Sequence, residues 1–286
     1  MLKIQILTSC ICIAIHGCSG DSTSLKENAN IEFEPYKPEL IEKVNIDCPE
    51  KKSYSTILEL NKLPRVSTYE KRFPKIFDSL KTIGKFRSDI SLDSIDKKST
   101  FEKLAQLSNM KSIDISLSNA YNRPTRRGIN LLNQVKQIII NGARSHHLTQ
   151  LANLDSLIHL EIGWYNVDST MPEETFYQKK LRTVSIYASH IINLPLSIKK
   201  LCLLEEFTAN KSSFHNLPFD NSTNLNLKTV WMMNADYFGE SFAELENFES
   251  LDTLFINKDM LHKLDSNYIL SKTVEGVYFD NFYKIY

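Results

Sequence analysis

The feature that most constrains this chain is a run of apolar side chains that recurs about every 23 residues. Each run has apolar residues at its first, fourth and sixth positions, as in Leu181, Val184 and Ile186. Eight such runs begin at residues 110, 135, 157, 181, 204, 227, 251 and 274, so the successive differences are 25, 22, 24, 23, 23, 24 and 23. A spacing this narrow over eight runs predicts a stack of similar units.

A second apolar series leads into the runs at three-residue steps, as in Leu245, Phe248 and Leu251. The segment 191–198 reads Ile-Ile-Asn-Leu-Pro-Leu-Ser-Ile, and its Asn-Leu-Pro recurs at residues 216–218. Together these features resemble the leucine-rich repeats of bacteria and plants. The resemblance covers about two thirds of the chain. It implies an α/β solenoid, a leucine-rich-repeat horseshoe of about eight repeats with a parallel sheet on its concave face and irregular or short helical returns on its convex face.

The units depart from this family at their ninth position, where an Asn ladder usually satisfies backbone groups at the bend. Here that position holds other residues, including Ala143, Tyr165, Ser189 and Ser212. Because buried backbone groups need partners, we expect small hydroxyl groups or water to take over these hydrogen bonds.

The N-terminal residues resemble a targeting signal. Residues 1–17 carry a single charge and a short apolar run, which is typical of a signal peptide. They end in Ile-His-Gly before Cys18, which resembles the lipobox of bacterial lipoproteins, although His16 stands where a small residue is usual. The resemblance implies that Cys18 is acylated and that the protein is lipid-anchored in the bacterial cell envelope, at the outer membrane or cell surface. Ordinary secretion, with Cys18 left as a thiol, is the alternative.

The rest of the chain divides into three parts. Residues 18–38 are polar and read as a flexible, lipid-attached tether. Residues 39–100 are expected to form an N-terminal cap with a possible degenerate unit at Ile83, Phe86 and Ser88. Residues 101–286 form the predicted repeat domain, and we find no later apolar stretch long enough to span a membrane.

Composition excludes several functions. The chain has 34 basic residues (Lys plus Arg) and 34 acidic residues (Asp plus Glu), so its net charge does not indicate nucleic-acid binding. The eight glycines form no phosphate-binding motif, and we recognise no catalytic triad, metal-ligand spacing or cofactor motif. We therefore expect a protein that is not an enzyme and holds no cofactor or metal. Cys48 and Cys202 are expected to be isolated apolar residues, with a bridge between them as the alternative.

Binding is expected on the concave face, where the strand residues between the buried ones point outward. The fifth positions of the last three runs are Trp231, Phe255 and Tyr278, a predicted aromatic row. Further candidate residues on this face are Met233, Tyr187, Trp164, Asn257 and Asp280. Exposed aromatic rows are typical of interaction sites, but the tail at residues 281–286 could instead cover these strands.

Three functions follow from this surface. The first is a membrane-anchored binding protein that captures a protein or peptide partner. The second is a surface lipoprotein that binds carbohydrate, with the aromatic side chains as stacking platforms. The third is a structural subunit of an envelope complex that pairs through the edge of its C-terminal strand.

Overall fold

The computed structural model describes residues 56–69, 73–91, 98–117, 128–165, 170–190, 193–239, 242–266, 274–277 and 282–285. All of them belong to one compact unit, Asn45–Tyr286. The expected signal peptide, the tether and Cys18 lie outside the described residues.

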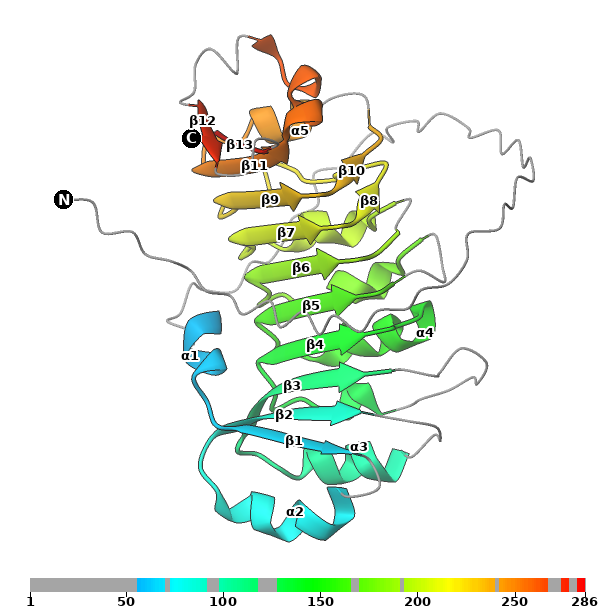
Figure 1. The fold of residues 1–286 in the computed structure, drawn as a ribbon. Coiled ribbons are helices and arrows are strands. Elements are labelled where there is room, and N and C mark those ends of the chain that lie inside the picture. The colour runs from blue at the N-terminus through cyan, green and yellow to red at the C-terminus, as the bar shows by residue number, and fades with distance from the viewer. Residues whose placement is uncertain are drawn as a thin grey trace, which may run out of the picture. The chain divides into compact units, whose positions relative to one another are not determined.

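One eleven-stranded sheet dominates this unit (Figure 1). Among the described residues, nine of its strands run parallel and each pairs with the strand of the next unit. Equivalent positions lie opposite one another, as Leu160 with Val184 and Ile162 with Ile186. The predicted α/β solenoid with a parallel sheet is confirmed. The nine strands are β1 (Arg65–Tyr69), β2 (Phe86–Ser91), β3 (Met110–Ser116), β4 (Gln137–Asn141), β5 (His159–Gly163), β6 (Thr183–Tyr187), β7 (Glu206–Asn210), β9 (Thr229–Met233) and β11 (Thr253–Asn257).

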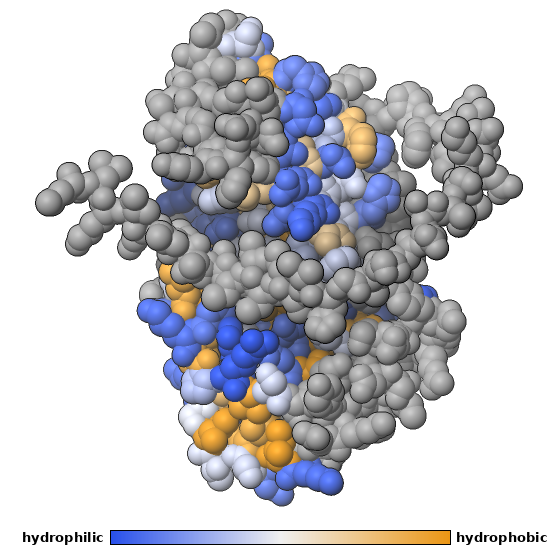
Figure 2. All heavy atoms as spheres, viewed as in Figure 1, coloured by the Kyte–Doolittle hydropathy of each residue, from blue (hydrophilic) through white to orange (hydrophobic). Residues whose placement is uncertain are grey.

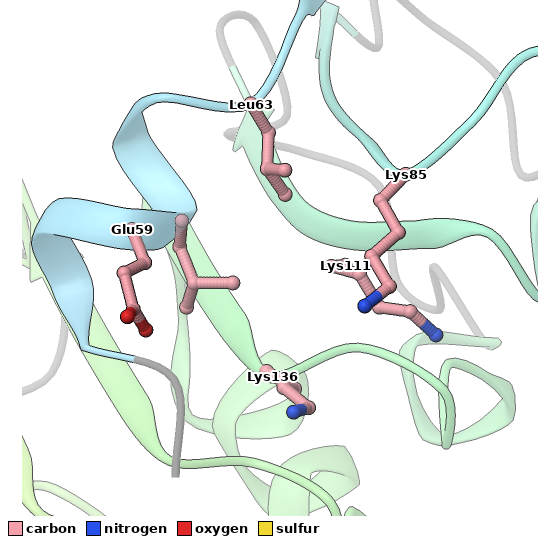
Figure 3. Close-up of a pocket in the computed structure, with 6 residues that line it drawn as sticks. Glu59, Leu63, Lys85, Lys111 and Lys136 are labelled. Atoms are coloured by element: carbon pink, nitrogen blue, oxygen red, sulfur yellow. The ribbon is translucent and has the colours of Figure 1, made fainter.

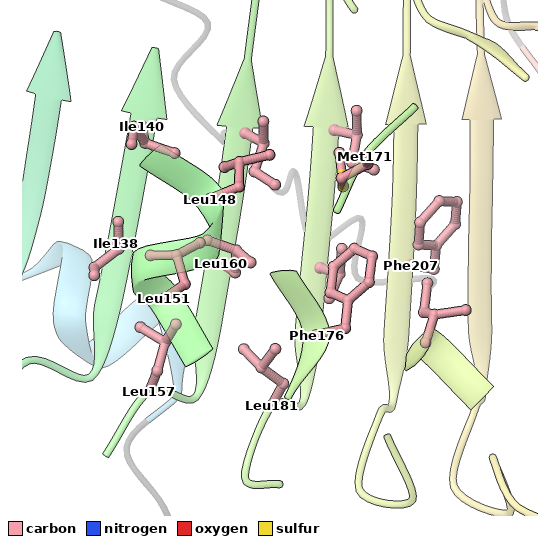
Figure 4. Close-up of a cluster of buried hydrophobic side chains, with 14 of the residues drawn as sticks. Ile138, Ile140, Leu148, Leu151, Leu157, Leu160, Met171, Phe176, Leu181 and Phe207 are labelled. Atoms are coloured by element: carbon pink, nitrogen blue, oxygen red, sulfur yellow. The ribbon is translucent and has the colours of Figure 1, made fainter. Parts of the chain in front are cut away.

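The core is a continuous apolar column between the sheet and the returns (Figure 4). The first positions of successive units stack within it: Leu181, Leu204 and Leu227 are fully buried, and Leu251 is 5% exposed. Burying one leucine side chain contributes about 1.5–3 kcal/mol. No unit can bury these side chains alone, so neighbouring units stabilise each other.

Short helices form the returns on one side of the sheet, and none in the described part of the chain has the length and apolar character of a membrane span. Side chains join neighbouring returns: the Glu173 carboxylate accepts hydrogen bonds from the backbone N–H groups of Leu196 and Ser197, at 2.9 and 2.7 Å. A small parallel sheet of β8 (Ser213–Phe214) and β10 (Asp236–Tyr237) lies beside them. The helical pieces are α2 (Phe73–Thr82), α3 (Lys98–Ala105), η1 (Ile129–Leu131), α4 (Ser145–Leu148), η2 (Thr149–Asn153), η3 (Glu173–Phe176), η4 (Leu196–Lys200), α5 (Ala243–Glu246) and η5 (Lys258–Lys263).

The chain leaves the strands through a repeated corner at the eighth position of the unit. The backbone there is left-handed in five successive units, with φ between 46° and 71°: Gly142, Trp164, Ala188, Lys211 and Asn234. Four of these residues carry a side chain, for which this conformation is costly. The corner is therefore held by the stack, in which each corner N–H donates to the next unit, as Ala188 does to the Asn210 carbonyl at 2.9 Å.

Small hydroxyl groups replace the Asn ladder at two ninth positions, as expected. The Ser189 hydroxyl accepts from the Tyr165 N–H at 3.0 Å and donates to the Tyr187 carbonyl. The Ser212 hydroxyl accepts from the Ser189 N–H at 3.2 Å and donates to the Asn210 carbonyl. A hydroxyl can do both because it is donor and acceptor at once.

At the N-terminal end, the sheet extends before residue 101. Helix α1 (Ile57–Asn61) leads to β1, which pairs with β2. The β2 register differs from the expected degenerate unit: Ser88 and Ile90 oppose Ile113 and Ile115, with an irregularity after Phe86. The expected first position, Ile83, precedes the strand and is 38% exposed.

At the C-terminal end, the prediction that the eighth run pairs in parallel with the strand before it is wrong. A strand does form at β12 (Val274–Val277), but it pairs antiparallel with β13 (Phe282–Ile285). Strand β13 lies between β12 and β11 and is antiparallel to both. The alternating pattern of a strand fixes which side chains are buried but not which neighbour it pairs with, so the sequence pattern missed this insertion.

Cys202 is disulfide-bonded, which contradicts the expectation that it is an isolated apolar residue. It lies buried in the return that precedes β7. The chain's other cysteines lie outside the described residues. Disulfides persist mainly in oxidising compartments such as the periplasm and the cell surface.

Candidate binding surface

The face of the sheet opposite the helical returns, which we call the open face, carries the odd-numbered positions of each strand. In β6, β7 and β9 the odd positions are half-buried and the even positions are buried, as the period of two requires. Figure 2 shows that hydrophilic side chains cover much of the described part of this side, whereas a hydrophobic area lies near β1.

An aromatic pair lies at the C-terminal half of the open face. Trp231 and Phe255 occupy opposite positions of neighbouring strands. Their rings are stacked, with centroids 3.8 Å apart and planes 12° from parallel. Phe255 is 7% exposed and Trp231 is half-buried, so Phe255 supports the indole and Trp231 is the ring with more surface available. Two other residues of the predicted surface, Tyr278 and Asp280, lie outside the described residues.

The next two candidates, Met233 and Asn257, have different roles: one lies on the surface and the other supports the backbone. Met233 follows Trp231 on the open face and is half-buried, so it adds a pliable apolar contact beside the indole. Asn257 is instead engaged with the backbone of the neighbouring corner. Its amide oxygen accepts from the Asn234 N–H, and its amide nitrogen donates to the Ala235 carbonyl, both at 2.9 Å.

Trp164 lies at the edge of the predicted surface. It occupies the left-handed corner after β5, with φ 57°, and its side chain is 58% exposed. Its backbone N–H donates to the Tyr187 carbonyl at 3.1 Å. The two tryptophans therefore differ: Trp231 belongs to a strand and is supported by a second ring, whereas Trp164 belongs to a corner.

Tyr187 takes part in a polar network that joins side chains of β6, β4 and β3. Its hydroxyl donates to the Asn141 side chain, and the Asn141 amide donates to Asp114 at 3.2 Å. The Tyr187 ring reaches Asn141 by lying over Gly163, where an added Cβ would collide with the ring. Gly163 is thus required for this contact, and Tyr187 is a fixed part of the surface.

Half-buried carboxyl groups lie on the same half of the open face. Burial, followed by the charge of Asp89, raises the pKa of Asp114 to about 6. Burial, followed by the charge of Asp114, raises the pKa of Glu161 to about 7. Burial also raises the pKa of Glu206 on β7. This half of the surface therefore changes charge near neutral pH.

Asp114 and Glu161 occupy fifth positions, which the repeat pattern places on the concave face, but neither is among the predicted binding residues. The sequence signal for them is that both are acidic and both occupy the fifth position, in units separated by one other unit. This spacing places two like charges on the same face. Among the described residues, no group of three or more His, Cys, Asp or Glu side chains is arranged to hold a metal ion.

Comparison with protein-family models and with curated proteins finds no match. A similar solved structure is that of a leucine-rich-repeat protein of Leptospira interrogans, with 16% identity and a TM-score of 0.42. The match covers 65% of this chain and 52% of that protein, so this chain matches about half of its length. The strand register, the stacked leucines and the repeated corner give this chain the character of a leucine-rich-repeat solenoid.

Proposed function

We propose that this chain is a lipid-anchored binding protein of the bacterial cell envelope that captures a protein or peptide partner on the open face. The observation that carries the proposal is the Trp231–Phe255 stack, with Met233 beside it. Tryptophan is enriched at the energetic centres of protein interfaces, where a rigid ring with firm support is desolvated at little cost in side-chain entropy.

The proposed location rests on two separate observations. The first is the signal-peptide and lipobox pattern before Cys18. The second is the disulfide at Cys202, which fits an oxidising compartment. Growth of the cells with a labelled fatty acid should label the parent protein and leave the Cys18→Ser variant unlabelled. Equal labelling of both would contradict acylation at Cys18.

The partner can be sought by site-specific photo-crosslinking in the native cell. A crosslinking amino acid at Met233 samples the open face, and one at Tyr177, which is 47% exposed after η3, samples the opposite side. We expect one covalent adduct from position 233 and none of that mass from position 177. The same adduct from both positions, or from position 177 alone, would remove the open face as the binding surface.

The contribution of the aromatic pair is then measured with the identified partner. Trp231→Ala should raise the Kd about 30-fold, as expected for an interface residue worth about 2 kcal/mol. Trp164→Ala is the matched control, since it removes the other tryptophan from a corner. Similar losses in both variants would mean that binding does not centre on the strand pair. Binding of a glycan in place of a protein would favour the carbohydrate alternative.

A further inference from the structure

A pocket separate from the aromatic pair lies at the beginnings of the strands in the N-terminal half (Figure 3). It has a volume of about 240 Å³ and is lined by Glu59, Leu60, Leu63, Lys85, Lys111 and Lys136. Typical pockets for drug-sized ligands are larger, about 300–1,000 Å³, so this one suits a small chemical group.

Three of these residues are lysines on three successive units. Lys85 precedes β2, Lys111 is the second residue of β3, and Lys136 precedes β4. Lys111 and Lys136 both occupy the second position of their units, on strands about 4.8 Å apart, and Lys85 in the preceding unit lines the same pocket. Figure 3 shows Lys85 and Lys111 together on one wall of the pocket, Lys136 on an adjoining wall and Glu59 on the other side.

The second position of the unit, which Lys111 and Lys136 occupy, has a different character later in the stack. There Arg182 is followed by Glu205, and the two side chains form an ion pair in which Arg182 Nη2 lies 2.6 and 2.5 Å from the carboxylate oxygens. Lys228 is followed by Asp252. Cation and anion thus alternate in the later units, whereas three cations succeed one another at the pocket.

The charges of the three lysines repel one another at this pocket, which Glu59 also lines. Burial lowers the pKa of Lys111, and the charges of Lys136 and Lys85 lower it further. Lys111 is also held in place, since its ammonium donates to the Ser108 carbonyl at 2.6 Å. An anion between the three ammonium groups would reduce their repulsion.

We propose that the pocket of Lys85, Lys111 and Lys136 binds a phosphate group. Three ammonium donors match the several charges and acceptor oxygens of a phosphate, and the small volume matches its size. Leu60 and Leu63 provide an apolar wall beside the group. The phosphate can belong to a soluble compound or to a phospholipid headgroup, and both sources present the same oxygens to the lysines.

The test uses the full chain with Cys18→Ser, so that an acyl chain does not contribute to membrane binding. Calorimetric titration with pyrophosphate at low salt measures the soluble source. Co-sedimentation with phosphatidic acid vesicles, compared with phosphatidylcholine vesicles, measures the lipid source. Binding to pyrophosphate assigns a soluble compound, and binding to the phosphatidic acid vesicles alone assigns a headgroup.

The lysines are tested by replacing all three with glutamine, which should weaken binding about tenfold if each charge contributes about 0.5 kcal/mol. Lys85→Gln alone, at an exposed position, should give a smaller loss and protects the test against misfolding of the triple variant. Glu59→Gln should strengthen binding, because it removes a negative charge while glutamine can keep the capping box with Thr56.

Lys228→Gln is the matched control, since Lys228 occupies the same position of a later unit outside the pocket. Its affinity should equal that of the parent. The proposal is overturned if neither probe binds, if the lysine variants bind as tightly as the parent, or if Lys228→Gln weakens binding as much as the triple replacement.

Discussion

The two halves of the open face share one backbone and differ in chemistry. Strands β3 to β6 present carboxyl groups and the Tyr187–Asn141–Asp114 network, whereas β9 and β11 present stacked aromatic rings. The backbone is set by the buried even positions and the corners, which are alike in both halves. The odd positions differ between the halves, and they give the two halves their different properties.

The largest expected effect concerns the crowded contact in the polar half. Gly163→Ala should reduce the free energy of unfolding by about 1–3 kcal/mol, because the new methyl group collides with the Tyr187 ring. Urea denaturation measures the change. Gly84→Ala is the control, since a Cβ there meets no atom within 4 Å. Adding Tyr187→Ala to Gly163→Ala should relieve only part of the collision, because the added Cβ would also lie 2.5 Å from Asn141 Oδ1. If it relieves none, the ring does not lie over Gly163.

The next effect is a pH dependence that belongs to the polar half. The pKa values of Asp114 and Glu161 are raised in the folded state, to about 6 and about 7, so the folded chain binds protons more tightly than the unfolded chain. Their stabilising contribution is complete at low pH and is lost as the pH rises through these values. Stability should therefore fall between pH 5 and pH 8, by about 1–2 kcal/mol after allowance for solvent screening.

Glu161→Gln tests this assignment, since glutamine imitates the protonated acid. The variant should be more stable than the parent at pH 8 and should show a weaker fall in melting temperature between pH 5 and pH 8. Trp231→Ala, in the aromatic half, should keep the pH dependence of the parent. An unchanged slope in Glu161→Gln would show that other groups cause the effect.

A smaller effect is expected at Asn257 in the aromatic half, where a loss of stability should occur without a loss of partner binding. Asn257→Ala removes two hydrogen bonds to the neighbouring corner and should cost about 1 kcal/mol of stability. It should leave partner affinity within about twofold, since its amide is directed to the backbone. Thermal unfolding and binding are measured on the same preparation. A large loss of affinity with unchanged stability would show that Asn257 contacts the partner.

The smallest effect is expected at the corner tryptophan. Trp164→Ala should change the free energy of unfolding by less than about 0.5 kcal/mol, because the side chain is largely exposed. Chemical denaturation provides the measurement. A loss above 1 kcal/mol would show that the indole is packed against the surface and that the contrast with Trp231 is smaller than proposed.

The sequence predicted the parts of the fold that depend on a repeated pattern. Leu181, Leu204 and Leu227 stack as expected because each unit must bury them against its neighbours. The pattern could not show that β13 inserts beside β11, because pairing depends on the whole chain end. It also missed the register of β2, where a small polar residue, Ser88, occupies a buried position.

For the candidate surface, the sequence identified which residues face outward but not how they contact one another. Trp231 and Phe255 were predicted to be neighbours, and they stack. Tyr187 reaches Asn141 across an intervening strand, a contact that depends on the absent side chain of Gly163. Asn257 was selected for its position, but its partners are backbone groups, which a residue pattern does not reveal.

The antiparallel β13 has a consequence for how such an array can grow. It occupies the hydrogen-bonding edge of β11 that an additional parallel unit would need. A longer protein of this type would therefore arise by duplication of an internal unit, with the terminal hairpin carried along unchanged. An engineered extension should likewise be inserted between existing units, for example after β7, where the parallel register continues on both sides.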